Sequence, residues 1–135
     1  MGKPEEMEEY LVDTNILLRY LLRDIEDQFE FAKKQMVLAQ ERKIVIFIPL
    51  LVFVEINFIL RGLYQQPKEK VIGAIRSIAE QSFLDIENRE IILASLRVYE
   101  RSVISLVDAV FVAQAKNRGL KLLTFDKKLA GLMKI

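Results

Sequence analysis

The chain has 135 residues, which is enough for one domain with a single sizeable core. Its 20 lysines and arginines nearly balance its 19 aspartates and glutamates, so any nucleic-acid contact would have to come from a local basic patch. The absence of cysteine and histidine excludes disulfides, zinc–thiolate sites, cysteine nucleophiles and histidine as a base or metal ligand.

The composition also bears on where the protein acts. A chain without cysteine fits a reducing cytoplasm, and Met1–Glu9 is acidic and lacks the apolar core of a signal peptide. The longest apolar run, Ile44–Leu60, is interrupted by Pro49, Glu55 and Asn57, whereas a spanning helix needs about 20 apolar residues. We therefore expect a cytoplasmic protein without membrane contact, and we interpret the run as a buried strand followed by a buried helix.

Strand-like and helix-like segments alternate along the chain, with no repeat or linker between them. This alternation predicts an α/β fold in which helices cover both faces of a central parallel sheet. We expect one three-layer α/β/α sandwich domain over residues 1–135. The patterns predict four strands, at Glu8–Val12, Ile44–Ile48, Phe83–Ile86 and Leu120–Thr124. They predict helices at Thr14–Arg23, Glu26–Arg42, Pro49–Leu60, Lys68–Glu80, Asn88–Arg101 and Ser105–Arg118, and a helical turn at Asp126–Leu132. Gly62 is expected to end the third of these helices, and Gly119 the sixth.

Four acidic residues stand at positions where chemistry is expected. Asp13 and Asp126 each follow a predicted strand, and ligands of parallel sheets bind beyond the carboxyl ends of the strands. Helices that start near this edge would bring Asp108 and Glu55 to the same rim. Clustered carboxylates repel one another unless a hard cation lies between them, and oxygen ligands favour Mg²⁺ or Mn²⁺ over zinc.

Each acid also has a purely structural interpretation. Asp13 and Asp126 could cap the helices that follow them, and Ser105-x-x-Asp108 resembles a capping box. Glu55 lies in a helix that is otherwise apolar all round, where an ionised carboxylate costs several kcal/mol unless it is paired. Its partner could be a base from elsewhere in the fold, or it could be a metal ligand that faces a cleft.

Four motifs, in order and spacing, resemble those of PIN-domain ribonucleases, and most of all the VapC-type toxins of toxin–antitoxin pairs. The resemblance covers nearly the whole chain, and its strength lies in the four motifs together. The first is Val12–Leu21, the second is Pro49-x5-Glu55, the third is Asp108-Ala109-x4-Ala113-x5-Gly119, and the fourth is Leu122–Asp126.

The resemblance implies an endoribonuclease that depends on Mg²⁺ or Mn²⁺ and hydrolyses RNA as the toxin of such a pair. It also implies a homodimer and an antitoxin partner. The apolar helices at Asn88–Arg101 and from Pro49 to Leu60 agree with a dimer, because they offer more apolar surface than one core needs. The implied residues are Asp13, Glu55, Asp108 and Asp126 as catalytic metal ligands, with Asn15 and Thr124 as supporting residues. Among the basic residues, Arg19 and Lys127 stand nearest the acidic motifs and are the first candidates for RNA binding, with ordinary solvated surface charge as the alternative.

Three alternatives remain open. A PIN-like scaffold without strong catalysis would act in RNA processing or in binding a partner. A small aspartyl-phosphate phosphatase would need Asp-x-Asp in its first motif, where this chain has Asn15 as the second residue. A receiver domain would need an acidic pair after the first strand and an aspartate after the third, which are not both present. In addition, Lys127 and Lys128 stand where many relatives carry a further acid, so the number of metal ions is open.

Overall fold

The computed structural model describes residues 7–135, so part of the acidic stretch Met1–Glu9 lies outside the described residues. The chain divides into two compact units. Unit 1 comprises the described part of Met1–Ile56 together with Gln81–Glu87, and unit 2 comprises Asn57–Glu80 and Asn88–Ile135. None of the helices in the described part of the chain has the length and apolar character needed to cross a membrane.

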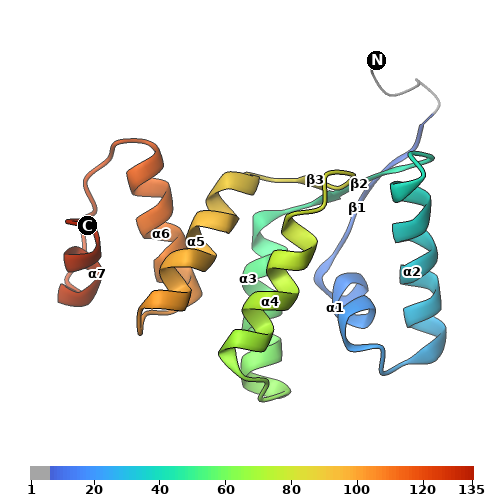
Figure 1. The fold of residues 1–135 in the computed structure, drawn as a ribbon, viewed down its shortest axis with the longest axis horizontal. Helices are drawn as coiled ribbons and strands as arrows, with labels where there is room; N and C mark the ends of the chain where they lie inside the picture. The colour runs from blue at the N-terminus through green and yellow to red at the C-terminus, as the bar shows by residue number, and fades with distance from the viewer. Residues whose placement is uncertain (1–6) are drawn as a thin grey trace. The chain divides into compact units, whose positions relative to one another are not determined.

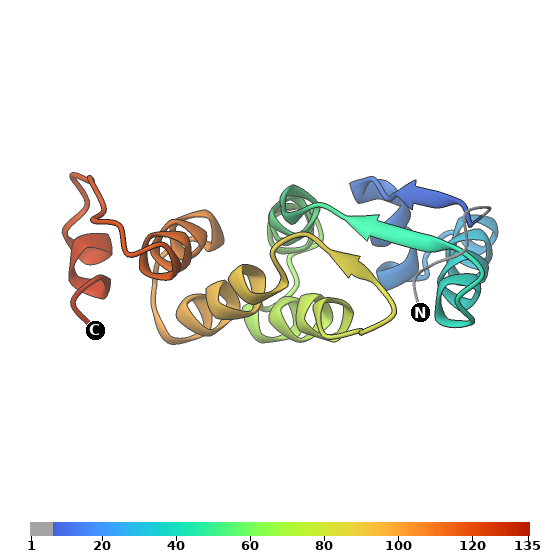
Figure 2. The same cartoon turned by 90° about the horizontal axis from the view of Figure 1, so that it is seen from above.

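Unit 1 contains a parallel sheet of three strands. These are β1 (Glu9–Leu11), β2 (Val45–Ile48) and β3 (Asp85–Ile86), in the order β1-β2-β3. The three arrows run in the same direction (Figure 2). The sheet and the helices that flank it confirm the predicted α/β fold class, and the strands fall within the segments predicted for them.

Backbone hydrogen bonds continue the ladder one residue beyond β1 and β3. The N–H of Val12 donates to the carbonyl of Phe47 at 3.0 Å, and the N–H of Glu87 donates to the carbonyl of Ile48 at 3.0 Å. Because the strands are parallel, the segments that follow them leave the same edge of the sheet. Asp13 and Glu87 therefore both lie at the carboxyl edge of unit 1.

Three helices complete unit 1: α1 (Thr14–Leu22), α2 (Glu26–Gln40) and α3 (Leu50–Phe58), whose last two residues belong to unit 2. Helix α1 packs against α2, and α2 packs against β2 (Figure 1). The apolar residues that these elements bury form the core of the unit. They are Val12, Leu17, Leu18, Ala32, Met36, Ala39, Ile46, Ile48, Val52, Phe53, Ile56, Leu84 and Ile86.

The prediction that α3 is buried on all sides is wrong. Val52, Phe53 and Ile56 are buried, but Glu55 is exposed, and it shares its exposed face with Leu51 and Phe58. Positions three and four apart lie on the same side of a helix, so an apolar composition can still leave one face in contact with water. The carboxylate of Glu55 therefore does not bear the burial cost expected from its neighbours in the sequence.

Unit 2 is helical in its described residues. Helix α5 (Arg89–Arg101) packs against both α4 (Lys68–Ala79) and α6 (Leu106–Asn117), and α7 (Lys127–Leu132) packs against α6 (Figure 1). Gly62 does not end the helix before α4, because the chain continues as the π-helical turn η1 (Ile59–Leu63). The core of the unit consists of Leu60, Val71, Ile72, Ile75, Ile78, Ala79, Ile91, Ile92, Leu96, Tyr99, Ile104, Leu106, Ala109, Val110, Val112, Ala113, Ala115 and Leu129.

The segment Leu120–Thr124 does not form the predicted strand. Gly119 ends α6 as expected, with a φ of 65° that suits glycine, but no ladder follows it. Leu123 and Phe125 are fully exposed. A strand requires a neighbouring strand with which to exchange hydrogen bonds, and unit 2 contains none among its described residues.

Candidate acidic site

Asp13 caps helix α1. It follows β1 in an extended conformation, and its Oδ1 accepts a hydrogen bond from the N–H of Ile16 at 3.1 Å. This bond satisfies one of the free N–H groups of the first helical turn, as the structural interpretation predicts. The cap uses a single oxygen, so it does not prevent Asp13 from binding a ligand at the edge of the sheet.

Glu55 is linked to the residue that follows Asp13. The hydroxyl of Thr14 donates to Oε1 of Glu55 at 3.1 Å, and this bond joins the start of α1 to the exposed face of α3. The first two predicted motifs thus meet within unit 1, and Thr14 is a contact that the sequence analysis missed. In the sequence, only the position of Thr14 within the first motif pointed to a role for it.

Asp108 lies in the first turn of α6, but it does not cap that helix. Oγ of Ser105 accepts from the N–H of Asp108 at 3.1 Å, so Ser105 is the capping residue. Of the two reciprocal hydrogen bonds of a capping box, only the one from the N–H of Asp108 to Ser105 is therefore present among the described residues. The carboxylate of Asp108 is half-buried and accepts no hydrogen bond within the described part of the chain.

Asp126 caps α7 and is positioned by Thr124. Its Oδ1 accepts from the N–H groups of Lys128 at 2.8 Å and Leu129 at 3.2 Å. Its own N–H donates to Oγ1 of Thr124 at 3.0 Å, so the hydroxyl of Thr124 fixes the backbone immediately before the cap. Asp126 is exposed, and Lys127 directly after it is exposed as well.

The carboxylate oxygens of these four acids are the kind of ligand that a hard divalent cation prefers. The described hydrogen bonds occupy one oxygen each of Asp13, Glu55 and Asp126, and no bond within residues 7–135 occupies the second. Asp13 and Glu55 belong to unit 1, whereas Asp108 and Asp126 belong to unit 2. Among the described residues, neither unit by itself brings three or more acids close enough to hold a metal ion.

Arg19 and Asn15 line the same pocket of unit 1, which has a volume of about 300 Å³ and also includes Asp27 and Phe31. Nη1 of Arg19 donates to both carboxylate oxygens of Asp24, at 2.8 and 2.7 Å. The sequence analysis did not identify Asp24 as this partner. A phosphate group that bound to Arg19 would have to compete with this ion pair.

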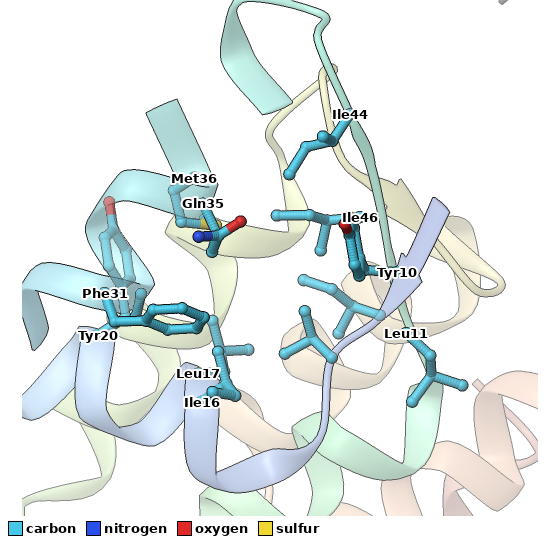
Figure 3. A pocket seen from close by; sticks show the side chains of 13 residues that line it. Tyr10, Leu11, Ile16, Leu17, Tyr20, Phe31, Gln35, Met36, Ile44 and Ile46 are labelled. Carbon is cyan, nitrogen blue, oxygen red and sulfur yellow. The ribbon is translucent and has the colours of Figure 1, made fainter. Parts of the chain in front are cut away.

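The larger cavity of unit 1 is apolar and lies apart from the predicted acids. It has a volume of about 340 Å³ between the sheet and helices α1 and α2 (Figure 3). None of the four acids lines it. The acidic site that the sequence predicts is therefore not located in this cavity. Its labelled lining residues are Tyr10, Leu11, Ile16, Leu17, Tyr20, Phe31, Gln35, Met36, Ile44 and Ile46.

Comparison with known proteins identifies the family. The sequence matches the family model of the PIN domain over residues 10–134, which include all four acids. No curated protein and no solved structure gives a significant match. Because the family match extends over nearly the whole sequence, the chain belongs to the PIN-domain family.

Proposed function

We propose that this protein is an endoribonuclease that depends on Mg²⁺ or Mn²⁺ and acts as the toxin of a toxin–antitoxin pair. PIN-domain proteins are in general metal-dependent ribonucleases, so the family implies RNA as the substrate and a divalent metal ion as the cofactor. The single observation that carries the proposal is the PIN match over residues 10–134, a range that contains Asp13, Glu55, Asp108 and Asp126.

These four carboxylates would hold the metal ion. A bound divalent ion lowers the pKa of a water molecule and offsets negative charge on the phosphate oxygens. Asp13 and Glu55 are fixed in unit 1 by the α1 cap and by Thr14, so their remaining oxygens are available at the carboxyl edge of the sheet. The absence of histidine leaves carboxylates, lysines, tyrosines and water to exchange protons with the reacting groups.

We propose the four carboxylates as one set of metal ligands. The continuous family match across residues 10–134 supports it. Arg19 and Lys127 would contact RNA phosphates, with Asn15 and Thr124 as supporting residues. The hydrogen bond from Asp126 to Thr124 agrees with that supporting role.

The toxin role, a homodimer, an antitoxin partner and a cytoplasmic location belong to the same proposal. The resemblance of Val12–Leu21 to the first motif of VapC-type toxins supports the toxin role. The apolar helices at Asn88–Arg101 and from Pro49 to Leu60 support the homodimer, because they offer more apolar surface than one core needs. Growth arrest on expression would test the toxin role, and light scattering that gives twice the mass of one chain would test the dimer.

The decisive experiment compares wild type with Asp13→Asn in RNA cleavage, in Mn²⁺ and in EDTA. Asparagine retains the α1 cap, so the variant should fold. Its cleavage should fall by about two orders of magnitude, because metal activation supplies several kcal/mol. Asp85→Asn changes an exposed acid of β3 in the same way and is the matched control. RNA that is bound but not cut by wild type would favour the scaffold alternative, and turnover of small phosphoesters would favour the phosphatase.

A further inference from the structure

Helix α3, which carries Glu55, is capped by a residue that is distant in the sequence. The first N–H groups of a helix have no partner inside it, and the proline at position 49 has no side-chain acceptor to offer them. The N–H of Leu50, the first residue of α3, donates to Oε1 of Glu87 at 2.8 Å. Glu87 thus does for α3 what Asp13 does for α1.

Glu87 is itself fixed by the sheet. Its N–H donates to the carbonyl of Ile48 at 3.0 Å, directly beyond the pair that Ile48 of β2 makes with Ile86 of β3. One residue therefore joins the end of β2, the end of β3 and the start of α3, all within unit 1. Its negative charge at the N-terminus of α3 is also favourable to the helix dipole.

We propose that Glu87 is a positioning residue that holds Glu55 in place for metal binding. This inference rests on the proposed function. Glu55 lies five residues after Leu50, about 7.5 Å along the helix axis. Glu55 contacts Thr14 beside Asp13, so a shift of the first turn of α3 would move Glu55 relative to both.

The alternative is that Glu87 binds the metal ion directly, since it follows β3 as Asp13 follows β1. The structure favours positioning, because among the described residues of unit 1 Glu87 does not join Asp13 and Glu55 in a group of three acids close enough to hold a metal ion. Two substitutions separate these roles. Glu87→Gln keeps the length and the acceptor oxygen but loses the charge, whereas Glu87→Asp keeps the charge but is one methylene too short to reach Leu50. If Glu87 positions α3, its side chain must be long enough to reach Leu50. If Glu87 binds the metal ion, its side chain must keep its negative charge.

The experiment measures Mn²⁺ affinity by paramagnetic resonance of the free ion in wild type, Glu87→Gln, Glu87→Asp and Asp85→Ala. Asp85 is an exposed acid on the same strand and serves as the control. We expect about tenfold weaker binding in Glu87→Asp, as for other residues that orient metal ligands, and near wild-type binding in the other two. Weaker binding in Glu87→Gln with normal binding in Glu87→Asp would overturn the proposal in favour of ligation.

A second readout does not depend on metal and separates failure of this inference from failure of the proposed function. The energetic coupling between Thr14 and Glu55, measured by a double-mutant cycle without metal, should fall by at least half in Glu87→Asp and persist in Glu87→Gln. Unchanged coupling and unchanged Mn²⁺ affinity in Glu87→Asp would refute the positioning role. If wild type bound no Mn²⁺, the proposed function would fail, and the coupling alone would decide whether Glu87 positions Glu55.

Discussion

The hydroxyl of Thr14 donates a hydrogen bond of 3.1 Å to the carboxylate of Glu55, although 41 residues separate the two in the sequence. Thr14 is the first residue of α1, and its neighbour Asp13 is the cap of that helix. Glu55 lies on the exposed face of α3. The bond therefore links two acids of the proposed site through a residue that has no charge of its own.

Removal of the Thr14 hydroxyl should weaken this link without disturbing the cap of α1. We expect Thr14→Val to lower the free energy of unfolding by about 0.5–1 kcal/mol, near the low end for a hydrogen bond, because Glu55 is exposed. Thr14→Ser keeps the hydroxyl and should have a smaller effect. Urea unfolding of Thr14→Val, Glu55→Ala and the double variant measures the coupling, and strictly additive effects would show that the bond contributes nothing.

Two substitutions at the start of α6 should affect stability and RNA cleavage independently of each other. Ser105→Ala removes the cap of this helix and should cost about 1 kcal/mol of stability while RNA cleavage persists. Asp108→Asn leaves that cap intact, so it should fold like wild type and lose cleavage. Urea unfolding and a cleavage assay on both variants check this pair of outcomes. A stable Ser105→Ala or a fully active Asp108→Asn would each contradict the corresponding assignment.

Much of this fold could be predicted from local patterns. The helices follow the periodicity of apolar residues, and Asp13 and Asp126 cap α1 and α7 as aspartate before a helix commonly does. Leu120–Thr124 shows the limit of such patterns, because strand propensity becomes a strand only when another strand supplies the ladder. The exposure of Glu55 shows a second limit, since composition does not reveal which face of an apolar helix packs.

The acids of the site and Arg19 could be named from the sequence, but the residues that position or engage them could not. Thr14, Asp24 and Glu87 act through bonds whose partners are set by the fold. Only Asp24 lies near its partner along the chain, and nothing in its local pattern marked it for pairing with Arg19. Glu87 had a weak signal, because it follows a strand as Asp13 does. An acid in that position is also common at ordinary strand ends, so the sequence alone did not single it out.

The two predicted RNA-binding residues, Arg19 and Lys127, should contribute unequally to RNA affinity. Lys127 is exposed at the start of α7, whereas Arg19 is engaged by Asp24. We expect Lys127→Ala to weaken RNA binding more than Arg19→Ala does, and to reduce the slope of log affinity against log salt by about one. Fluorescence anisotropy with one RNA at several salt concentrations measures both quantities. A steeper loss in Arg19→Ala would mean that RNA displaces Asp24 readily, and equal slopes in all three proteins would remove Lys127 from the interface.

Thermal melting with and without Mn²⁺ should reveal whether Glu55 and Asp108 both take part in metal binding. A ligand that binds only the folded protein stabilises it by RT ln(1 + [M]/Kd), about 2.7 kcal/mol at a hundredfold excess over Kd. Glu55→Gln and Asp108→Asn each remove one carboxylate charge, from unit 1 and unit 2 respectively. Both should lose most of the Mn²⁺ response, while Asp85→Asn, an exposed acid outside the proposed site, should keep it. In EDTA, both site variants should be at least as stable as wild type, because each removes one of several carboxylates that repel one another when no metal lies between them. If only one variant lost the response, the acid changed in the other variant would not take part in metal binding. If all four proteins showed the same small response, Asp13, Glu55, Asp108 and Asp126 would not form a metal site, and the assignment of the nuclease centre would be wrong.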